Sequence, residues 1–250
     1  MTMPFRVVIP ARFDSSRLPG KVLLPLAGKP MLQWVHERAR ASGAAEVCIA
    51  TDDERIATAA RGFGADVAMT ARTHVSGTDR IAEVALTRQW RDEDIVVNVQ
   101  GDEPLIPPVV IDQVAKVLAA NARADIGTLA VKIESLTDFG DPNVVKVACD
   151  AGGRALYFSR AQIPFNRDSP TVVPPAALRH IGIYAYRVAA LSKLAGLAPT
   201  RLEQVEKLEQ LRALENGMEI RVELATERPL ADVNTAADLE RAERALRVRP

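Results

Sequence analysis

Short apolar runs alternate with longer amphipathic segments along the first half of the chain. The runs are rich in β-branched residues and predict strands at Arg6 to Ile9, Val47 to Ala50, Asp66 to Met69 and Ile95 to Val99. Two segments between them, Met31 to Ala41 and Thr78 to Trp90, repeat apolar residues at helical spacing. This alternation predicts a doubly wound α/β fold.

The first and fourth of these runs, Arg6 to Ile9 and Ile95 to Val99, are nearly continuous in apolar character. Such runs are typical of central parallel strands that are covered on both faces. Ligands of these sheets bind beyond the carboxyl ends of the strands. We therefore expect the functional residues in the loops that follow the two runs.

The pattern changes after about Ile126. The segments Val144 to Cys149 and Ala155 to Phe158 flank a Gly152-Gly153 turn, which predicts a hairpin projecting from a mixed sheet. The proline-rich segment Ile163 to Ala177 has no clear period and predicts an ordered long loop or a lid.

The last third of the chain returns to regular patterns, and we expect a single domain over residues 1–250 with a subdomain inserted at about 126–186. The expected elements are a strand at His180 to Tyr186, helices at Val188 to Leu194, Glu203 to Asn216 and Ala236 to Arg247, and a strand at Glu219 to Leu224.

Composition narrows the function classes. The 250 residues are 48% apolar, and 32 basic residues balance 32 acidic ones, so we expect neither a nucleic acid nor a membrane as partner. The N-terminus resembles no secretory signal, and no stretch is long enough to span a bilayer. Cys48 and Cys149 lie inside apolar runs, which suits packed thiols in a reducing compartment and predicts a cytoplasmic protein.

The loop after the first strand carries the densest chemical signal. It reads P-A-R-F-D-S-S-R-L-P-G-K and offers Arg12, Arg17 and Lys21 at the carboxyl end of a central strand. Three cations on a tight glycine turn suit a triphosphate. A solvated basic loop is the alternative. The loop matches neither the P-loop nor the dinucleotide fingerprint, which disfavours a kinase or a dehydrogenase.

A second signal, V-N-V-Q-G-D-E-P, ends the fourth strand with Gln100, Asp102 and Glu103. Carboxylates that face a phosphate loop are natural magnesium ligands, because magnesium takes one or two carboxylates together with phosphate oxygens and water. The alternative is an acidic turn before a helix that begins near Pro107. The neighbouring basic loop favours magnesium.

A third signal, Asp232-Val233-Asn234-Thr235, precedes the last helix. Asn234 or Thr235 suits a helix cap. In an extended segment Asp232 and Asn234 point to the same face, so both are candidate oxygen ligands for a metal opposite Asp102.

Four shorter segments complete the candidate pocket, and each has a simpler structural explanation. Arg80, Arg160 and the pair Glu209-Gln210 also suit solvent-exposed surfaces. His180 also suits a strand histidine with a satisfied hydrogen bond, which is the commoner fate of a lone histidine.

Six motifs in order, P-A-R-x-x-S-x-R-L-P-G-K, S-G-T-D-R, V-N-V-Q-G-D-E-P, A-L-Y-F-S-R, R-H-I-G-I-Y and L-E-Q-L-R, resemble the 3-deoxy-manno-octulosonate cytidylyltransferase family over nearly the whole chain. The resemblance implies a Rossmann-like nucleotidyltransferase fold and a homodimer whose inserted subdomain binds the sugar and the partner. It also implies CTP and 3-deoxy-manno-octulosonate (Kdo) as substrates, magnesium as cofactor, and CMP-Kdo for lipopolysaccharide synthesis as product.

The resemblance also implies residue roles. Nucleotide contacts are expected from Ala11, Arg12, Arg17, Lys21, Arg80 and Gln100. Sugar contacts are expected from Gln100, Tyr157, Arg160, His180, Tyr184, Glu209 and Gln210. Arg17, Lys21 and Asp102 are the expected catalytic residues, with Asp102 as the principal metal ligand.

One position departs from the family, which has V-D-T where this chain has Val233-Asn234-Thr235. An amide still offers an oxygen to magnesium but one negative charge fewer, and Asp232 is placed to restore that charge. Two alternatives stay open: a cytidylyltransferase for another sugar acid, such as a sialic acid, and a non-catalytic nucleotide-binding protein on the same scaffold.

Overall fold

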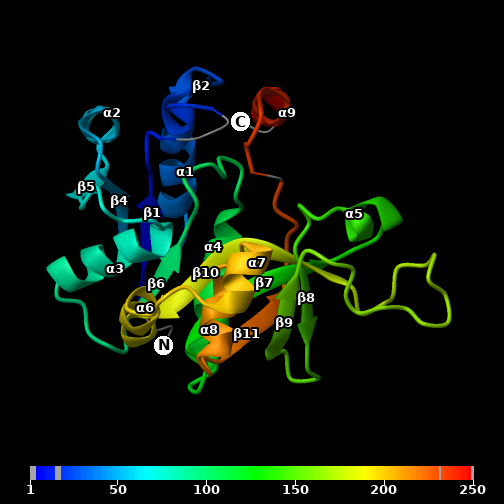
Figure 1. Ribbon diagram of the computed structural model, residues 1–250. Coiled ribbons are helices and arrows are strands. Elements are labelled where there is room, and N and C mark those ends of the chain that lie inside the picture. The colour runs from blue at the N-terminus through cyan, green and yellow to red at the C-terminus, as the bar shows by residue number, and fades with distance from the viewer. Residues whose placement is uncertain (1–3, 15–17, 231, 249–250) are drawn as a thin grey trace.

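The computed structural model describes residues 4–14, 18–230 and 232–248 (Figure 1). Within these residues the central sheet has nine strands, seven of them in the order β11-β7-β10-β6-β1-β4-β5. The strands are β1 (Phe5–Pro10), β4 (Glu46–Thr51), β5 (Asp66–Met69), β6 (Ile95–Asn98), β7 (Ile126–Lys132), β8 (Lys146–Cys149), β9 (Ala155–Ser159), β10 (Leu178–Arg187) and β11 (Ile220–Leu224). A separate ribbon pairs β2 (Pro25–Leu26) with β3 (Lys29–Pro30).

The first half of the sheet is parallel, as predicted: β1 lies between β4 and β6, and β5 pairs with β4. Strand β10 runs antiparallel to both β6 and β7, and β11 is parallel to β7. The sheet is therefore mixed, with one half, formed by β1, β4, β5 and β6, entirely parallel. Strand β7, the helices at Glu54–Gly62 and Leu136–Gly140, and the β2–β3 ribbon are not among the predicted elements, whereas the helix expected to begin near Pro107 is present at Pro108–Ala120.

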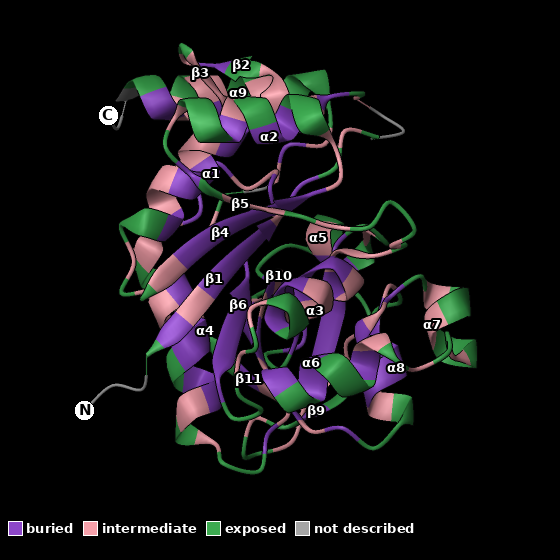
Figure 2. Ribbon diagram, turned by 90° about the vertical axis from the view of Figure 1, so that its left-hand side faces the viewer, coloured by how far each residue is buried: buried purple, intermediate pink, exposed green. Residues whose placement is uncertain are grey.

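Helices cover both faces of the sheet (Figure 2). They are α1 (Met31–Arg40), α2 (Glu54–Gly62), α3 (Gly77–Thr87), α4 (Pro108–Ala120), α5 (Leu136–Gly140), α6 (Val188–Ala195), α7 (Arg201–Glu206), α8 (Gln210–Glu215) and α9 (Ala236–Val248), with a short 3₁₀ turn η1 (Lys21–Leu23). In the described part of the chain, none of these helices combines the length and apolar character needed to cross a bilayer.

Strand β1 shows why the apolar run is continuous. Val7 and Ile9 pack into the core that α1 and α4 cover, whereas Val8 packs into the core that α3 and α6 cover. Side chains alternate between the two faces of a strand, so a strand with helices on both faces needs apolar residues at every position. This confirms the prediction that β1 is a central strand.

The predicted hairpin is β8 and β9, which pair with each other, and β8 also pairs with β10. The following segment, residues 163–177, projects from the body of the molecule at the right of Figure 1. Its end returns to the core, where Val173 and Ala177 pack with Ile133 and Phe139. The division into a main domain and an inserted subdomain at about 126–186 stays a prediction.

The single helix predicted from Glu203 to Asn216 is wrong in one respect, because two short helices occupy this range. Between α7 and α8, Lys207 has a left-handed backbone with φ of 54°. The change of direction places Leu208 and Leu211 in the core, while the described residues of α7 include no buried side chain. Burial of these two leucines overrides the helical pattern.

Candidate active site

Two loops meet at the carboxyl edge of the parallel strands. A Cβ atom at Gly101, in the loop after β6, would lie 3.1 Å from the carbonyl oxygen of Pro10 at the end of β1. Glycine permits this close approach. As a result, Lys21 Nζ lies 2.6 Å from Asp102 Oδ2. This contact joins the basic loop after β1 to the acidic loop after β6.

The segment before α9 is the third part of this cluster. The backbone N–H of Val233 donates to the carbonyl oxygen of Asp102 at 2.9 Å, and Val233 is buried beneath α9. Asn234 Nδ2 donates to Asp232, and Asn234 Oδ1 lies 3.4 Å from Lys21 Nζ. The same-face placement of Asp232 and Asn234 is thus confirmed, and both lie beside the Lys21–Asp102 pair.

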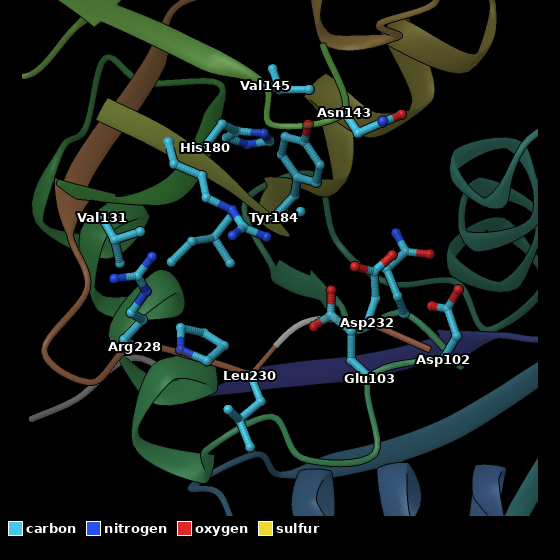
Figure 3. Close-up of a pocket in the computed structure, with 15 residues that line it drawn as sticks. Asp102, Glu103, Val131, Asn143, Val145, His180, Tyr184, Arg228, Leu230 and Asp232 are labelled. Carbon is cyan, nitrogen blue, oxygen red and sulfur yellow. The ribbon is translucent and has the colours of Figure 1, made fainter. Parts of the chain in front are cut away.

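A cavity of about 370 Å³ opens next to this cluster. Figure 3 shows Asp102, Glu103 and Asp232 together on one side, with His180 and Tyr184 across from them. The cavity is lined by Gln100, Asp102, Glu103, Val131, Asn143, Val145, Arg179, His180, Ile181, Gly182, Tyr184, Arg228, Pro229, Leu230 and Asp232. Five of the predicted sugar and metal positions therefore line one cavity: Gln100, Asp102, His180, Tyr184 and Asp232.

The acidic side of the cavity holds a buried carboxyl group. Burial, with the negative charges of Asp102 and Asp232, raises the pKa of Glu103 to about 8. Glu103 Oε2 is buried and has no hydrogen-bond partner among the described residues. A buried polar atom without a partner is unusual and marks a place where a ligand group fits.

His180 is a neutral hydrogen-bonding group. Burial lowers the pKa of its imidazole to about 3. Its Nε2 lies 2.9 Å from Thr128 Oγ1, and that hydroxyl donates to the carbonyl oxygen of Ile183 at 2.7 Å. Since the threonine proton is already used, His180 Nε2 carries the ring proton and Nδ1 is an acceptor. The strand-histidine explanation is thus confirmed, and the sugar contact of His180 stays a prediction.

Tyr184 packs against His180, with ring centroids 5.2 Å apart. It is half-buried, and desolvation raises the pKa of its phenol well above the usual value. The hydroxyl therefore stays protonated at any ordinary pH. Together the two rings present one acceptor and one hydroxyl to the cavity wall.

The predicted nucleotide contacts lie around the end of β1. Ala11 is buried, and its N–H donates to Ala50 O at 2.9 Å. Arg12 is exposed and lies 3.4 Å from the carbonyl oxygen of Val75. Arg17 lies outside the described residues. Arg80 is not a surface charge: it is 4% exposed, bonds to Thr70 and pairs with Asp52 at 3.4 Å.

Glu209 and Gln210 lie at the start of α8, away from the cavity lining. Glu209 Oε2 accepts from Thr78 Oγ1 at 2.9 Å, which ties α8 to the start of α3. Burial raises the pKa of the Glu209 carboxyl. Gln210 is 8% exposed, so the solvated-surface alternative for this pair does not hold.

Tyr157 and Arg160 both contact Glu206, which does not line the cavity. Arg160 Nε donates to Glu206 O at 2.7 Å, and its Nη1 donates to Pro142 O at 2.8 Å, next to the lining residue Asn143. Burial, with the nearby Glu206 charge, raises the pKa of Tyr157. In this chain alone, neither side chain lines the cavity.

Three polar lining residues, Asn143, Arg179 and Arg228, have no role in the predicted site, whereas Glu103 was expected as one of the carboxylates that end the fourth strand. Arg179 stands inside the quoted R-H-I-G-I-Y motif, so its signal was present. Asn143 and Arg228 carry no sequence signal, because the loops that hold them reach the cavity only through the fold. No set of three or more His, Cys, Asp or Glu side chains among the described residues is arranged to hold a metal by itself.

Comparison with known proteins agrees with this geometry. The sequence model of the family described as Cytidylyltransferase matches residues 6–220. The 3-deoxy-manno-octulosonate cytidylyltransferase of Thioalkalivibrio sulfidiphilus is 54% identical over 249 residues, covering 98% of this chain and 100% of that protein. The protein of the same name from Haemophilus influenzae strain PittEE is 52% identical over 247 residues, covering 96% and 97%.

Solved structures give the same result. CMP:2-keto-3-deoxy-manno-octonic acid synthetase, solved in complex with CTP, is 40% identical with a TM-score of 0.91, covering 99% of this chain and 100% of that chain. A cytidylyltransferase from Leptospira borgpetersenii, 19% identical with a TM-score of 0.65 and covering 99% and 88%, shares the fold. With this identity over nearly the full length of both chains, the protein belongs to the 3-deoxy-manno-octulosonate cytidylyltransferase family.

Proposed function

We propose that this chain transfers CMP from CTP to Kdo, giving pyrophosphate and CMP-Kdo for lipopolysaccharide biosynthesis. The observation that supports this best is the meeting of the Lys21–Asp102 pair with a polar cavity at the carboxyl edge of the sheet. The related synthetase solved with CTP has the same fold. The cavity is of a size that suits a small ligand.

On the nucleotide side, the loop after β1 holds the triphosphate. Lys21 supplies a positive charge beside Asp102, and Arg12 is exposed and accessible to phosphate oxygens. Arg17 has the same expected function from the family motif. We expect Ala11 and Gln100 to border the nucleotide, and Arg80 to support the floor of that site through Asp52.

On the sugar side, Gln100, His180 and Tyr184 line the cavity. His180 Nδ1 accepts a hydrogen bond from a sugar hydroxyl, since Nε2 is already used. Tyr157, Arg160, Glu209 and Gln210 remain proposed sugar contacts, and none of them lines the cavity of a single chain.

The side-chain oxygens on the acidic side of the cavity suit magnesium. Asp102 and Asp232 line one cavity with Glu103, whose Oε2 lacks a hydrogen-bond partner in the described part of the chain. Magnesium needs only one or two carboxylates, because phosphate oxygens and water complete its shell. Asp102 and Asp232, with the Asn234 amide, would hold it, and there it would neutralise charge and lower the pKa of the attacking hydroxyl.

The reaction is an in-line displacement at the α-phosphorus of CTP. The anomeric hydroxyl of Kdo forms the new P–O bond, the bond to the pyrophosphate oxygen breaks, and the hydroxyl proton passes to water. Lys21 stabilises the negative charge that develops on pyrophosphate. His180, with a pKa of about 3, is too weak a base to take the proton at neutral pH. Positioning and charge neutralisation therefore supply most of the rate.

We expect two copies of the chain to form a homodimer. Leu156 on β9 is 54% exposed, and Phe165 and Val172 on the projecting segment are 71% and 54% exposed. Exposed apolar side chains on a projecting arm suit contact with a second protomer. Light scattering tests this: the wild type should have the mass of a dimer, and Phe165→Glu should shift it to a monomer.

We also expect a cytoplasmic location. Cys48 and Cys149 are free thiols, and desolvation raises the pKa of each to about 11. Packed, unpaired thiols suit a reducing compartment. Fractionation of cells that express the chain tests this.

Pyrophosphate release is the test of the proposed activity. The chain is incubated with CTP, magnesium and either Kdo or a sialic acid, and matched samples lack the metal. Release with Kdo and magnesium supports the proposal, whereas release with the sialic acid alone would assign a different sugar. No release from a folded chain that binds CTP would indicate a non-catalytic nucleotide-binding protein.

A further inference from the structure

The cavity contains two arginines that the mechanism above does not use. Arg228 is 49% exposed at its side chain and faces Glu134 and Asp138 at 3.7 Å and 3.9 Å. Arg179 is less exposed, and its side chain makes no hydrogen bond or ion pair with any residue that the structure describes. Of the two arginines that line the described part of the cavity, Arg179 therefore offers the positive charge that no carboxylate compensates.

The strand pairing explains why Arg179 faces this space. It lies near the start of β10, directly opposite Val131 of β7 in an antiparallel pair. Residues opposite each other in such a pair point to the same face of the sheet, and Val131 also lines the cavity. A guanidinium held on a strand needs little reordering to bind a ligand.

The charges of the cavity are divided between its two sides. Figure 3 shows Asp102, Glu103 and Asp232 on one side, and Arg228 with Val131 on the opposite side. Strand pairing puts Arg179 next to Val131. An anionic group that enters the cavity is repelled by the Asp102 and Asp232 carboxylates and attracted by the arginine.

The substrate of the proposed reaction carries such an anionic group. A 2-keto sugar acid has its carboxylate on the carbon bonded to the reacting anomeric carbon. Guanidinium and carboxylate match in geometry and form paired, charge-assisted hydrogen bonds. We propose that Arg179 binds the carboxylate of the sugar acid and thereby selects acidic sugars over neutral ones; this rests on the proposed function.

The test compares Kdo with its uncharged 1-amide, using wild type, Arg179→Gln and Arg179→Lys. Wild type should prefer the acid over the amide by about 10- to 100-fold in kcat/KM, as expected for hydrogen bonds to a charged group. Arg179→Gln should lower kcat/KM for Kdo by a similar factor and leave the amide nearly unchanged, so the preference disappears. Arg179→Lys should keep part of the preference for the acid over the amide. The KM for CTP should not change in either variant.

Arg228→Gln is the matched control, because that arginine lines the same cavity but already has two acidic neighbours. It should retain the wild-type preference for the acid. The inference is wrong if Arg179→Gln keeps the wild-type preference, if Arg228→Gln loses it instead, or if Arg179→Gln mainly raises KM for CTP.

A binding measurement separates this inference from the proposed function. Calorimetric titration of the CTP complex with Kdo and with the amide uses the same three variants. If the wild type releases no pyrophosphate, the proposed function fails, but loss of the acid preference on Arg179→Gln still supports the assignment of Arg179. Equal binding of the acid and the amide by the wild type overturns the assignment of Arg179.

Discussion

Lys21 Nζ lies 2.6 Å from Asp102 Oδ2, although 81 residues separate them in the sequence. The contact exists because β1 and β6 are neighbouring parallel strands, so the loops that follow them meet at one edge. The pair keeps a positive charge where a triphosphate is expected and keeps the carboxylate partly shielded from water.

This relationship predicts the effect of Lys21→Ala. We expect kcat/KM for pyrophosphate release to fall at least about 100-fold, as when a group that stabilises developing charge is removed. Stability should fall by only about 1–2 kcal/mol, between the values for exposed and buried ion pairs. Steady-state kinetics and urea unfolding measure the two effects.

Lys29→Ala is the control for this change, because Lys29 pairs with Glu37 at 2.8 Å and does not line the cavity. It should retain wild-type turnover. Near-normal turnover of Lys21→Ala would contradict the function assigned to this lysine.

The contact between Asn234 and Asp232 predicts that the charge needed for magnesium comes from position 232. We expect Asp232→Asn to raise the magnesium concentration for half-maximal activity about 10-fold, in the range that loss of a metal-supporting group causes. The double variant Asp232→Asn/Asn234→Asp should restore the wild-type magnesium requirement, because one carboxylate is then present again.

Electron paramagnetic resonance of bound Mn²⁺ in the CTP complex measures the metal affinity without turnover. Glu227→Gln, which removes an exposed carboxylate in the segment before the site, should leave the affinity unchanged. The assignment is wrong if Asp232→Asn has no effect on metal binding and Asn234→Ala abolishes it.

Burial of His180 predicts a loss of stability in mild acid. The folded pKa of about 3 lies below the unfolded value of 6.5, so the unfolded chain binds more protons between these values. Stability from this group is full above pH 6.5 and falls by up to about 1.4 kcal/mol per pH unit towards pH 3.

Urea unfolding of wild type and His180→Asn between pH 7 and pH 4 measures this slope. The variant lacks the imidazole, so its stability should decline less steeply over the same range. Parallel slopes for the two proteins would show that His180 does not titrate on unfolding.

The left-handed backbone of Lys207 predicts a stabilising substitution. A side chain at φ of 54° costs about 1–2 kcal/mol that glycine avoids, and glycine loses about 0.5–1 kcal/mol of this gain through chain entropy. Lys207→Gly should therefore stabilise the protein by about 0.5–1 kcal/mol and raise Tm by about 1–4 °C.

Thermal unfolding measures this gain, and Lys207→Ala, which keeps a Cβ atom, should not show it. Turnover should be unchanged, because Lys207 is exposed and outside the cavity. A lower Tm for Lys207→Gly than for Lys207→Ala would show that the break between α7 and α8 is not strained.

Much of the fold was predictable because it depends on local patterns. The run through Val7, Val8 and Ile9 is apolar at every position, and the structure buries these side chains on alternate faces of the sheet. The loops after β1 and β6 were predictable as the functional edge, since chain direction in a parallel sheet places them together. The order of the six motifs was enough to identify the family.

Other features depend on contacts between distant segments, and only the tertiary structure decided them. Arg160 bonds to the backbone of Glu206, 46 residues away, and Thr78 bonds to Glu209, 131 residues away. The fold brings two carboxylates close to Arg228 and none to the side chain of Arg179 among the described residues. Residue types and their order are local properties, whereas burial, pKa and the partners of a charge are set by the segments that fold against it.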